Sequence, residues 1–452
     1  MDRISNLQDE LLCHVLSFLT IKEAALTSVL AKRWRNLFAY VPNLVLDDSV
    51  FLHPEEGKRE RDGVLESFMD FTDRVLALQG DSPIKKLTLI VKSGVDSVRV
   101  NRWIRNVLQR GVSELALFID LGDEYRLPPE LFVSKTLVVL IVAHRYDLDW
   151  HVLGISLPML KDLYLTSVGF CVDQFDTLLP ACPALKTLVS RMNWKNSNVT
   201  VSSATLEDLI IFSSERVVNP NSISFDTPSV VYFVYYDLVA EDYPKVNLTN
   251  LVKAKLDLVL SEYQIERIRA ANIDLLEDDV FLRFGNVWKL ISGIRNVRLL
   301  TLSSDTLEVL SFCCESMPVF NNLKILHIKS SESRGWQAMP VLLKNCPHLV
   351  TLVLQGLLHH VTDKCGDACD CISREDKGRS LISCPVKKLQ IKRFQGTIKE
   401  ISMVKHFLDY FPCLKKMEIY REENCPTNVE VLESLELMMK LYSCDVQYMD
   451  KK

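Results

Sequence analysis

Glycine is scarce in this chain, at 15 of 452 residues. That is few for a nucleotide-binding enzyme, and the sequence contains no Gly-rich phosphate loop ending in lysine, no Gly-x-Ser-x-Gly turn and no His-Glu-x-x-His pair. A catalytic cysteine would need a histidine brought to it by the fold, which sequence spacing does not reveal. We therefore expect a protein that is not itself an enzyme.

Long apolar runs are also missing. No segment approaches the roughly 18 consecutive apolar residues of a membrane helix, and the N-terminus offers no small-residue cleavage site. The 13 cysteines, an odd number spread along the chain, are typical of reduced thiols. The sequence therefore predicts no membrane partner and a location in the nucleus and/or the cytoplasm.

Excess charge of either sign is absent as well. The net charge is −5, so bulk electrostatics do not indicate a nucleic-acid binder. With 48% hydrophobic and 25% charged residues the chain has ordinary globular composition. Its length suits about three domains or one elongated repeat array.

The most informative stretch is 4–41, which predicts three short helices. Apolar residues recur at helical spacing in its first part, where Asn6 can act as N-cap. The run Thr20 to Glu23 resembles a capping box that starts a second helix, and Lys32 to Leu37 follows as a basic, aromatic segment. About forty residues cannot bury so many large side chains among themselves. The surplus must pack either on the rest of the chain or on a partner.

The order of these residues resembles the F-box, through Ile-Ser-Asn-Leu, Asp-Glu-Leu-Leu, Leu-Ser-Phe-Leu, Lys-Glu-Ala-Ala and Lys-Arg-Trp-Arg-Asn-Leu. Gln8 departs from the family, which usually has proline there, but the effect should be local. The resemblance implies that residues 1–50 dock on a Skp-type adaptor and, through it, on a cullin. It assigns nine residues jointly to the motif core and the adaptor-binding face, without separating the two roles: Leu7, Leu11, Leu12, Val15, Leu16, Phe18, Leu19, Val29 and Trp34.

After a hinge and linker helix (51–83), an apolar-x-x-apolar-x-apolar pattern begins at Ile84. It recurs more than a dozen times, mostly at the period of about 20–29 residues typical of leucine-rich repeats. We expect each repeat to supply one strand and one helix, with the apolar positions inward. The x positions should face the concave surface and are candidates for target binding: Lys161, Asp162, Tyr164, Glu207, Asp208, Ile210, Lys324, Ile325 and His327.

The predicted fold class is therefore α/β: a three-helix F-box, then a leucine-rich-repeat solenoid (84–354) with a parallel sheet on the concave face and helices on the convex face. A polar, cysteine-containing insertion follows (355–383). The remainder, 384–452, continues the repeat pattern and resembles the FBD domain, a C-terminal unit often found with F-boxes and leucine-rich repeats in plant proteins. The segment 261–294 replaces one repeat with longer helical material.

The polar insertion, together with Cys384 directly after it, holds the only residues that suggest a metal site. They are His359, His360, Cys365, Cys369, Cys371 and Cys384. Zinc sites usually pair their ligands as Cys-x-x-Cys, whereas here the spacing is Cys-x-x-x-Cys-x-Cys and no second pair follows. We therefore expect a solvent-exposed loop with reduced thiols and no metal or other cofactor, with bound zinc as the alternative.

Lys32, Arg33 and Arg35 around Trp34 could also indicate a DNA-reading helix. The first 45 residues nevertheless carry nearly balanced charge, a weak footprint for phosphate, so we expect no nucleic-acid partner. The resemblance favours a substrate receptor of a cullin ubiquitin ligase whose repeats bind an unknown target protein. The alternative is a repeat scaffold that binds its ligand without ubiquitin transfer.

Overall fold

A computed structural model describes residues 7–19, 21–29, 32–49, 64–80, 82–92, 94–122, 124–144, 154–171, 175–193, 198–213, 221–259, 286–361, 365–371, 375–422 and 429–449. The chain divides into two compact units, residues 1–193 and 194–452, which we call unit 1 and unit 2. Asn6 and Thr20 lie outside the described residues, as do residues 51–63 at the hinge and residues 261–285 of the segment expected to carry longer helical material.

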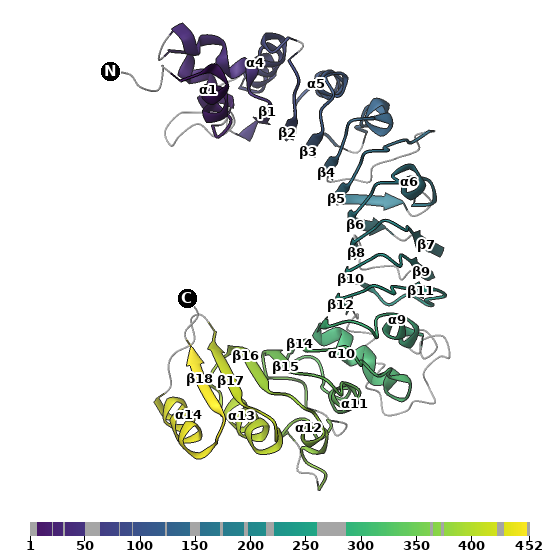
Figure 1. The fold of residues 1–452 in the computed structure, drawn as a ribbon, viewed down its shortest axis with the longest axis vertical. Coiled ribbons are helices and arrows are strands. Elements are labelled where there is room, and N and C mark those ends of the chain that lie inside the picture. Colours follow the sequence, from purple (N-terminus) through teal and green to yellow (C-terminus); the bar gives the residue numbers. More distant parts are fainter. Residues whose placement is uncertain are drawn as a thin grey trace. The chain divides into compact units, whose positions relative to one another are not determined.

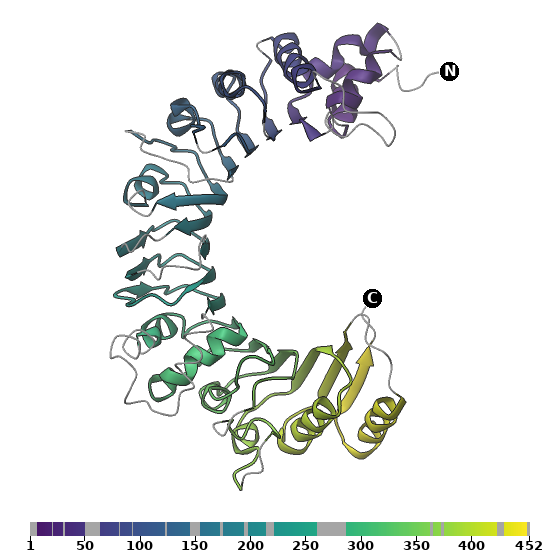
Figure 2. The ribbon, with the colours of Figure 1, turned by 180° about the vertical axis from the view of Figure 1, so that it is seen from behind.

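Unit 1 begins with short helices and continues as alternating strands and helices (Figures 1 and 2). Its elements are α1 Asp9–Leu16, α2 Ile21–Leu26, η1 Thr27–Val29, η2 Lys32–Tyr40, β1 Asn43–Asp47, α4 Val64–Leu78, β2 Lys86–Val91, α5 Ser97–Gln109, β3 Glu114–Ile119, η3 Pro129–Val133, β4 Val139–His144, β5 Asp162–Cys171, α6 Phe175–Ala181 and β6 Thr187–Asn193.

Unit 2 is built mainly of strands in its first part and of alternating strands and helices after that. Its elements are β7 Asn198–Ser202, β8 Asp208–Ser213, β9 Ser222–Asp226, β10 Tyr232–Leu238, β11 Val246–Asn247, β12 Lys253–Val259, α9 Val287–Gly293, β13 Leu299–Leu302, α10 Ser304–Leu310, η6 Ser311–Ser316, β14 Ile325–Lys329, α11 Met339–Lys344, β15 Thr351–Gln355, α12 Arg379–Ile382, β16 Lys388–Phe394, α13 Ile398–Tyr410, β17 Lys416–Arg421, α14 Val429–Leu441 and β18 Asp445–Met449.

Each unit contains a parallel sheet, as the sequence predicts. In unit 1 the strand order is β1-β2-β3-β4-β5-β6, and in unit 2 it is β8-β10-β12-β13-β14-β15-β16-β17-β18. Figure 1 shows α4, α5 and α6 on one face of the unit 1 sheet and α11, α13 and α14 on one face of the unit 2 sheet. The α/β class with a large parallel sheet is thereby confirmed.

The repeat pattern sets the register of these sheets. Leu87 is the partner of Leu115 on the next strand, and Leu326 is likewise the partner of Leu352. All four side chains are buried, because every second residue of a strand points to the same face. Equivalent apolar positions therefore stack from strand to strand, which buries a core that no single repeat could enclose.

The expectation of one helix per repeat is wrong in the first part of unit 2. There β7, β9 and β11 form a second, three-stranded parallel sheet where helices were expected. The repeats beginning at Leu185, Leu206 and Val230 are among the shortest in the chain, and β7 and β9 alternate apolar and polar residues with period two. Short connections of alternating residues favour strands over helices in this part of the unit.

Besides β7, β9 and β11, two strands of the larger parallel sheets escaped the sequence analysis, namely β1 and β18. β1 pairs in parallel with β2 and lies inside the range 1–50 that the pattern gave to the helical motif. β18 pairs in parallel with β17 near the C-terminus. Both occupy edges of their unit's sheet, where one neighbouring strand is enough and the apolar pattern is correspondingly short.

The expectation of a solvent-exposed cysteine loop is also wrong in part. Cys365 and Cys369 are buried, and only Cys371 of the three is exposed. The carboxylate of Asp367 is buried too and accepts a hydrogen bond from the backbone N–H of Ser380, the second residue of α12. The described segment 365–371 of the insertion is thus packed into unit 2.

Among all described residues, every helix is too short or too polar to cross a bilayer.

Candidate functional site

The four short helices at the start of unit 1, α1, α2, η1 and η2, make up a compact motif, which we call the helical motif. α1 contacts η2, and α2 contacts both η1 and η2. α1 carries apolar residues on two sides, since Leu11 and Val15 are four residues apart and so are Leu12 and Leu16. The two pairs are separated by roughly 100° around the helix axis. One of these sides can face the motif's interior while the other faces away from it.

The structure separates the nine residues that the sequence analysis grouped together. Leu12 and Leu16 are fully buried, and Trp34 is 6% exposed, so these three form the interior of the motif. The remaining six are exposed, and among them Phe18 and Val29 have 76% and 82% of their surface accessible. The exposed members are Leu7, Leu11, Val15, Phe18, Leu19 and Val29.

Two further exposed apolar side chains of the motif were missed. Leu26 ends α2 and Tyr40 ends η2, and both are mostly exposed. Leu26 belongs to the apolar residues expected of the second helix, but spacing could not show that it points outward. Large apolar side chains gathered on so small a motif are typical of a binding surface. We refer to these eight exposed residues together as the apolar face.

The helical motif is attached to the rest of unit 1 through packed elements. η2 contacts α4, and α2 contacts β1. The buried amide of Gln79, just after α4, donates a hydrogen bond of 3.3 Å to the carbonyl oxygen of Val41, which lies between η2 and β1. These contacts fix the motif to the first strand and first long helix of the unit.

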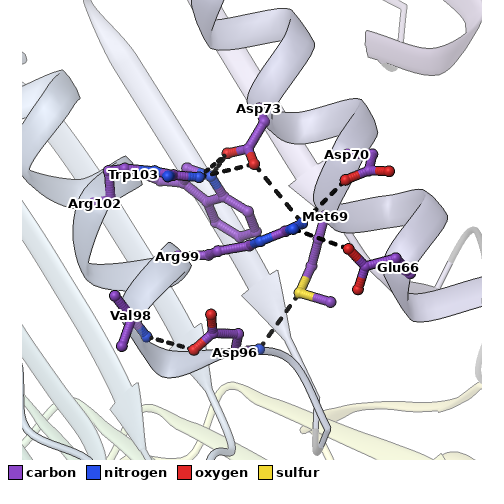
Figure 3. A network of polar contacts seen from close by, with 9 residues as sticks. All are labelled: Glu66, Met69, Asp70, Asp73, Asp96, Val98, Arg99, Arg102 and Trp103. Atoms are coloured by element: carbon purple, nitrogen blue, oxygen red, sulfur yellow. Dashed lines mark hydrogen bonds and ion pairs between the residues drawn. The ribbon is translucent and has the colours of Figure 1, made fainter.

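A polar network in turn joins α4 to α5 (Figure 3). Figure 3 shows Arg99 of α5 reaching towards Glu66, Asp70 and Asp73 of α4, with ion-pair distances of 2.9, 3.1 and 3.8 Å. The indole N–H of Trp103 donates to Oδ1 of Asp73 over 2.6 Å, and Arg102 binds the same carboxylate. These cationic and N–H partners hold the pKa of Asp73 below its ordinary value despite desolvation. The helical motif therefore packs on α4, which is itself held to α5 by these ion pairs and hydrogen bonds.

Unit 2 offers a second candidate surface, on the face of the sheet that carries the x positions. A pocket of about 610 Å³ lies over β14 to β17 and is lined by His327, Gln355, Gln390, Lys392, Arg393, Tyr420, Arg421 and Glu422. The pKa of His327 is lowered by burial and by the nearby Lys392, Lys329 and Lys255, so the imidazole is neutral near pH 7. Three cationic side chains against one carboxylate make the pocket lining positively charged.

Glu418 contacts two residues that line this pocket, Gln390 and Tyr420, and two lysines beside it. Its carboxylate is 4% exposed and accepts hydrogen bonds from Gln390 and Tyr420 over 2.6 and 3.1 Å. Lys388 and Lys416, on β16 and β17, each form an ion pair of 2.8 Å with it. These partners outweigh desolvation and lower the pKa of Glu418 to about 2.

Of the candidate positions named from the sequence, His327 is the one that lines the pocket.

Comparison with known proteins gives consistent results for both units. Residues 4–46 match the profile of the F-box domain, and residues 100–249 match that of the leucine-rich repeats of the FBD-associated F-box protein At5g56370. Three relatives from Arabidopsis thaliana are similar over 99% of this chain. They are F-box protein At3g59000 (60% identical, 94% of its length), F-box protein At3g03040 (57%, 98%) and F-box/LRR-repeat protein At3g58930 (56%, 98%).

Proposed function

Because this chain belongs to the family of F-box proteins with leucine-rich repeats, we propose that it is the substrate-recognition subunit of a Skp-adaptor/cullin/F-box ubiquitin ligase. F-box domains in general bind a Skp1-type adaptor, and proteins of this family are generally non-catalytic. In this role the helical motif docks on the adaptor, and the adaptor connects it to a cullin. The repeats hold a target protein close to the ubiquitin-transfer machinery supplied by the partners.

The observation that carries this proposal is the apolar face. Its large side chains lie on the segment that matches the F-box, while the interior of the motif is filled by Leu12, Leu16 and Trp34. Phe18 and Val29 are largely exposed to water. A partner that covers them lowers the free energy of the complex by about 25 cal/mol for each Å² of apolar area removed from water. Aromatic anchors in the centre of an interface commonly dominate such binding.

The direct test is adaptor binding by a double variant, Val15→Asp with Phe18→Asp, in the full-length chain. Both side chains are exposed, so the fold should persist while two charges enter the interface. We expect adaptor affinity, measured by calorimetry, to fall by about 30-fold or more, equivalent to about 2 kcal/mol.

The matched control is Val98→Asp, which places a charge on an exposed valine of α5 in the same unit. Its adaptor affinity should equal that of the wild-type chain. If wild-type protein shows no adaptor binding, or if the double variant binds as well as the control, the proposed role of the apolar face is wrong.

The alternative is a repeat scaffold that binds a protein without ubiquitin transfer. Reconstitution of the chain with the adaptor, the cullin and its RING subunit separates the two functions. The ligase proposal expects ubiquitin chains on captured material, and the Val15→Asp, Phe18→Asp variant should lose them. A wild-type complex that assembles but transfers no ubiquitin would favour the scaffold.

For the target, we propose an acidic segment of a protein bound on the x-position face of unit 2. The pocket there is lined by Lys392, Arg393 and Arg421, and burial together with the surrounding lysines lowers the pKa of His327. Fixed cations of this kind favour carboxylate-rich partners and raise their association rate. Capture from a plant extract by the wild-type chain and by Lys392→Glu tests this directly. We expect the charge reversal to lose the target and keep the adaptor.

We also propose that the protein acts in the nucleus and/or the cytoplasm. The ten cysteines whose side chains the structure describes form no disulfide, which suits a reducing compartment. Imaging of a fluorescent fusion under the protein's own promoter checks this proposal, and a secreted or vacuolar signal would contradict it.

A further inference from the structure

A cluster of metal-ligating side chains lies in unit 2, and none of its residues lines the pocket over β14 to β17. His359, Cys369 and Cys371 each offer one ligand atom, and these three atoms all lie within 4.8 Å of one another. Cys365 is close as well, since its thiol and that of Cys369 both interact with the side chain of His359. One imidazole and three thiols thus gather where the chain leaves β15 and approaches α12. We call these four residues the His-Cys cluster.

His359 is held in the orientation that a metal ligand needs. Its Nδ1 atom lies 3.0 Å from the carbonyl oxygen of Leu357, a contact in which the ring N–H donates. Its ring stacks on Trp336 at a centroid distance of 4.5 Å and an interplanar angle of 11°. The other nitrogen, Nε2, lies 3.3 Å from Sγ of Cys371. Metal-ligating histidines typically donate one ring N–H to a carbonyl in this way, which leaves the second nitrogen free to coordinate.

Trp336, on which the imidazole of His359 stacks, is itself held in place by burial and by a hydrogen bond. The indole is fully buried, and its N–H donates to Oγ of Ser330 over 2.9 Å. On the cysteine side, Gly366 lies so close to Pro340 of α11 that an added Cβ would come within 2.1 Å of the proline ring. The cysteine segment and the histidine are therefore each packed against ordered parts of unit 2.

The dimensions suit zinc. With bonds of about 2.3 Å to sulfur and 2.0–2.1 Å to nitrogen, the ligand atoms of a tetrahedral zinc site lie roughly 3.5–3.8 Å apart. The cluster spans 3.3 Å between His359 and Cys371 and no more than 4.8 Å among the three grouped residues, so small side-chain movements would complete the geometry. Cys365 and Cys369 are buried and Cys371 is exposed, so a cation can reach the site from solvent.

Charge and residue type favour zinc over other ions. Sulfur and imidazole ligands in a tetrahedral set are typical of zinc, whereas magnesium and calcium prefer oxygen. Three thiolates with one Zn²⁺ leave a single negative charge, and Lys399 lines the same pocket as His359 and Cys371. Cys384, the remaining cysteine of the sequence-based set, lies near Cys346 and Cys413 instead. It therefore serves as a control.

We propose that His359, Cys365, Cys369 and Cys371 form a structural zinc site within the polar insertion (355–383) of unit 2. The spacing Cys-x-x-x-Cys-x-Cys argued against zinc, but spacing considers only neighbours along the chain. The fold orients the side chain of His359, which the sequence analysis had already named, and brings it together with the thiols to complete a set of four ligands. Four protein ligands leave no open position, so the site stabilises the fold and takes no part in catalysis.

The test is the metal content of the full-length chain, expressed without a histidine tag and purified without chelators in a phosphine reductant. Native mass spectrometry should find one zinc per chain. Replacing zinc with Co²⁺ should produce the near-ultraviolet thiolate-to-cobalt charge-transfer absorption and the visible bands of a tetrahedral ion. Cys369→Ser should lose both the zinc and the charge-transfer band, and His359→Ala should lose most of the zinc.

Cys384→Ser is the matched control, since it removes another buried thiol of the same unit, and it should retain one zinc. A wild-type chain with less than about a tenth of a zinc per molecule in zinc-supplemented medium would overturn the proposal. Equal loss of zinc from Cys384→Ser and Cys369→Ser would also overturn it. Adaptor binding resides in unit 1, so its success or failure is independent of either outcome.

Discussion

The Nη2 atom of Arg33 lies 2.6 Å from Oδ1 of Asp9 and joins η2 to the first turn of α1. The same Nη2 atom donates to the carbonyl oxygen of Leu7 over 2.6 Å, just before the helix begins. α1 has Gln8 at its N-cap position, and the Gln8 side chain makes no capping bond. Arg33 thus secures a helix start that local sequence leaves without a cap, and it positions the exposed residues that follow.

Replacing Arg33 by alanine should weaken adaptor binding modestly. The pair is solvent-exposed on both sides, and such pairs contribute about 0–1 kcal/mol. We expect up to about a fivefold loss of adaptor affinity by calorimetry. Lys32→Ala removes the same charge from an exposed neighbour and is the control. An equal effect of the two changes would show that net charge, and not the contact with Asp9, is responsible.

Truncating a buried residue of α1 should lower the stability of the motif, whereas truncating an exposed one should lower adaptor affinity. Leu16→Ala removes a fully buried side chain and should destabilise the motif by about 2–5 kcal/mol. Leu11→Ala trims an exposed residue and should leave the melting temperature nearly unchanged while reducing adaptor affinity. Thermal unfolding and calorimetry on both variants check this. A Leu11→Ala variant that unfolds as early as Leu16→Ala would contradict the assignment of the two sides.

Asp73→Ala should destabilise unit 1 by about 1–3 kcal/mol, because it leaves the buried indole N–H of Trp103 without its acceptor. Asp70→Ala, which removes only an exposed contact to Arg99, should cost much less. The pKa of Asp73 is lowered in the folded state, so its contribution is complete above the ordinary aspartate value and is lost as pH falls through the folded pKa. Melting temperatures of both variants against pH provide the measurement.

Glu418→Gln should lower the stability of unit 2 by removing the charge between Lys388 and Lys416. The pKa of Glu418 falls from 4.5 to about 2 on folding. A lowered pKa stabilises the folded state above the unfolded value, so the difference between wild type and variant should be largest at neutral pH. It should shrink as pH falls from 4.5 towards 2. A difference that stays constant across that range would show that the carboxylate's charge is not what stabilises this face.

Leu16→Asp combined with Trp34→Ala would be a poor test of the adaptor face, although the sequence analysis assigns both residues jointly to the motif core and that face. Both side chains are buried, so the double change would unfold the motif and abolish binding for a reason unrelated to the interface. Val15 and Phe18 are the informative positions.

The repeated spacing of leucine and related residues was enough to locate the strands of both sheets, from Leu87 and Leu89 on β2 to Met417 and Ile419 on β17. A period of two within each strand and a near-constant step between strands are local properties, so they can be read along the chain. The linker helix α4 was found the same way. The sequence was likewise enough to identify the F-box and the leucine-rich repeats, because both are recognised from the order and spacing of residues along the chain.

Tertiary structure alone decided three other points. It turned Leu12 and Leu16 inward and Leu11 and Val15 outward, although both pairs are equally apolar and equally spaced. It placed strands where helices were expected in the short repeats of unit 2. It also brought the imidazole of His359 together with the thiols of Cys369 and Cys371 within the insertion. In each case the outcome depends on which neighbours a side chain meets in space, and sequence spacing records only neighbours along the chain.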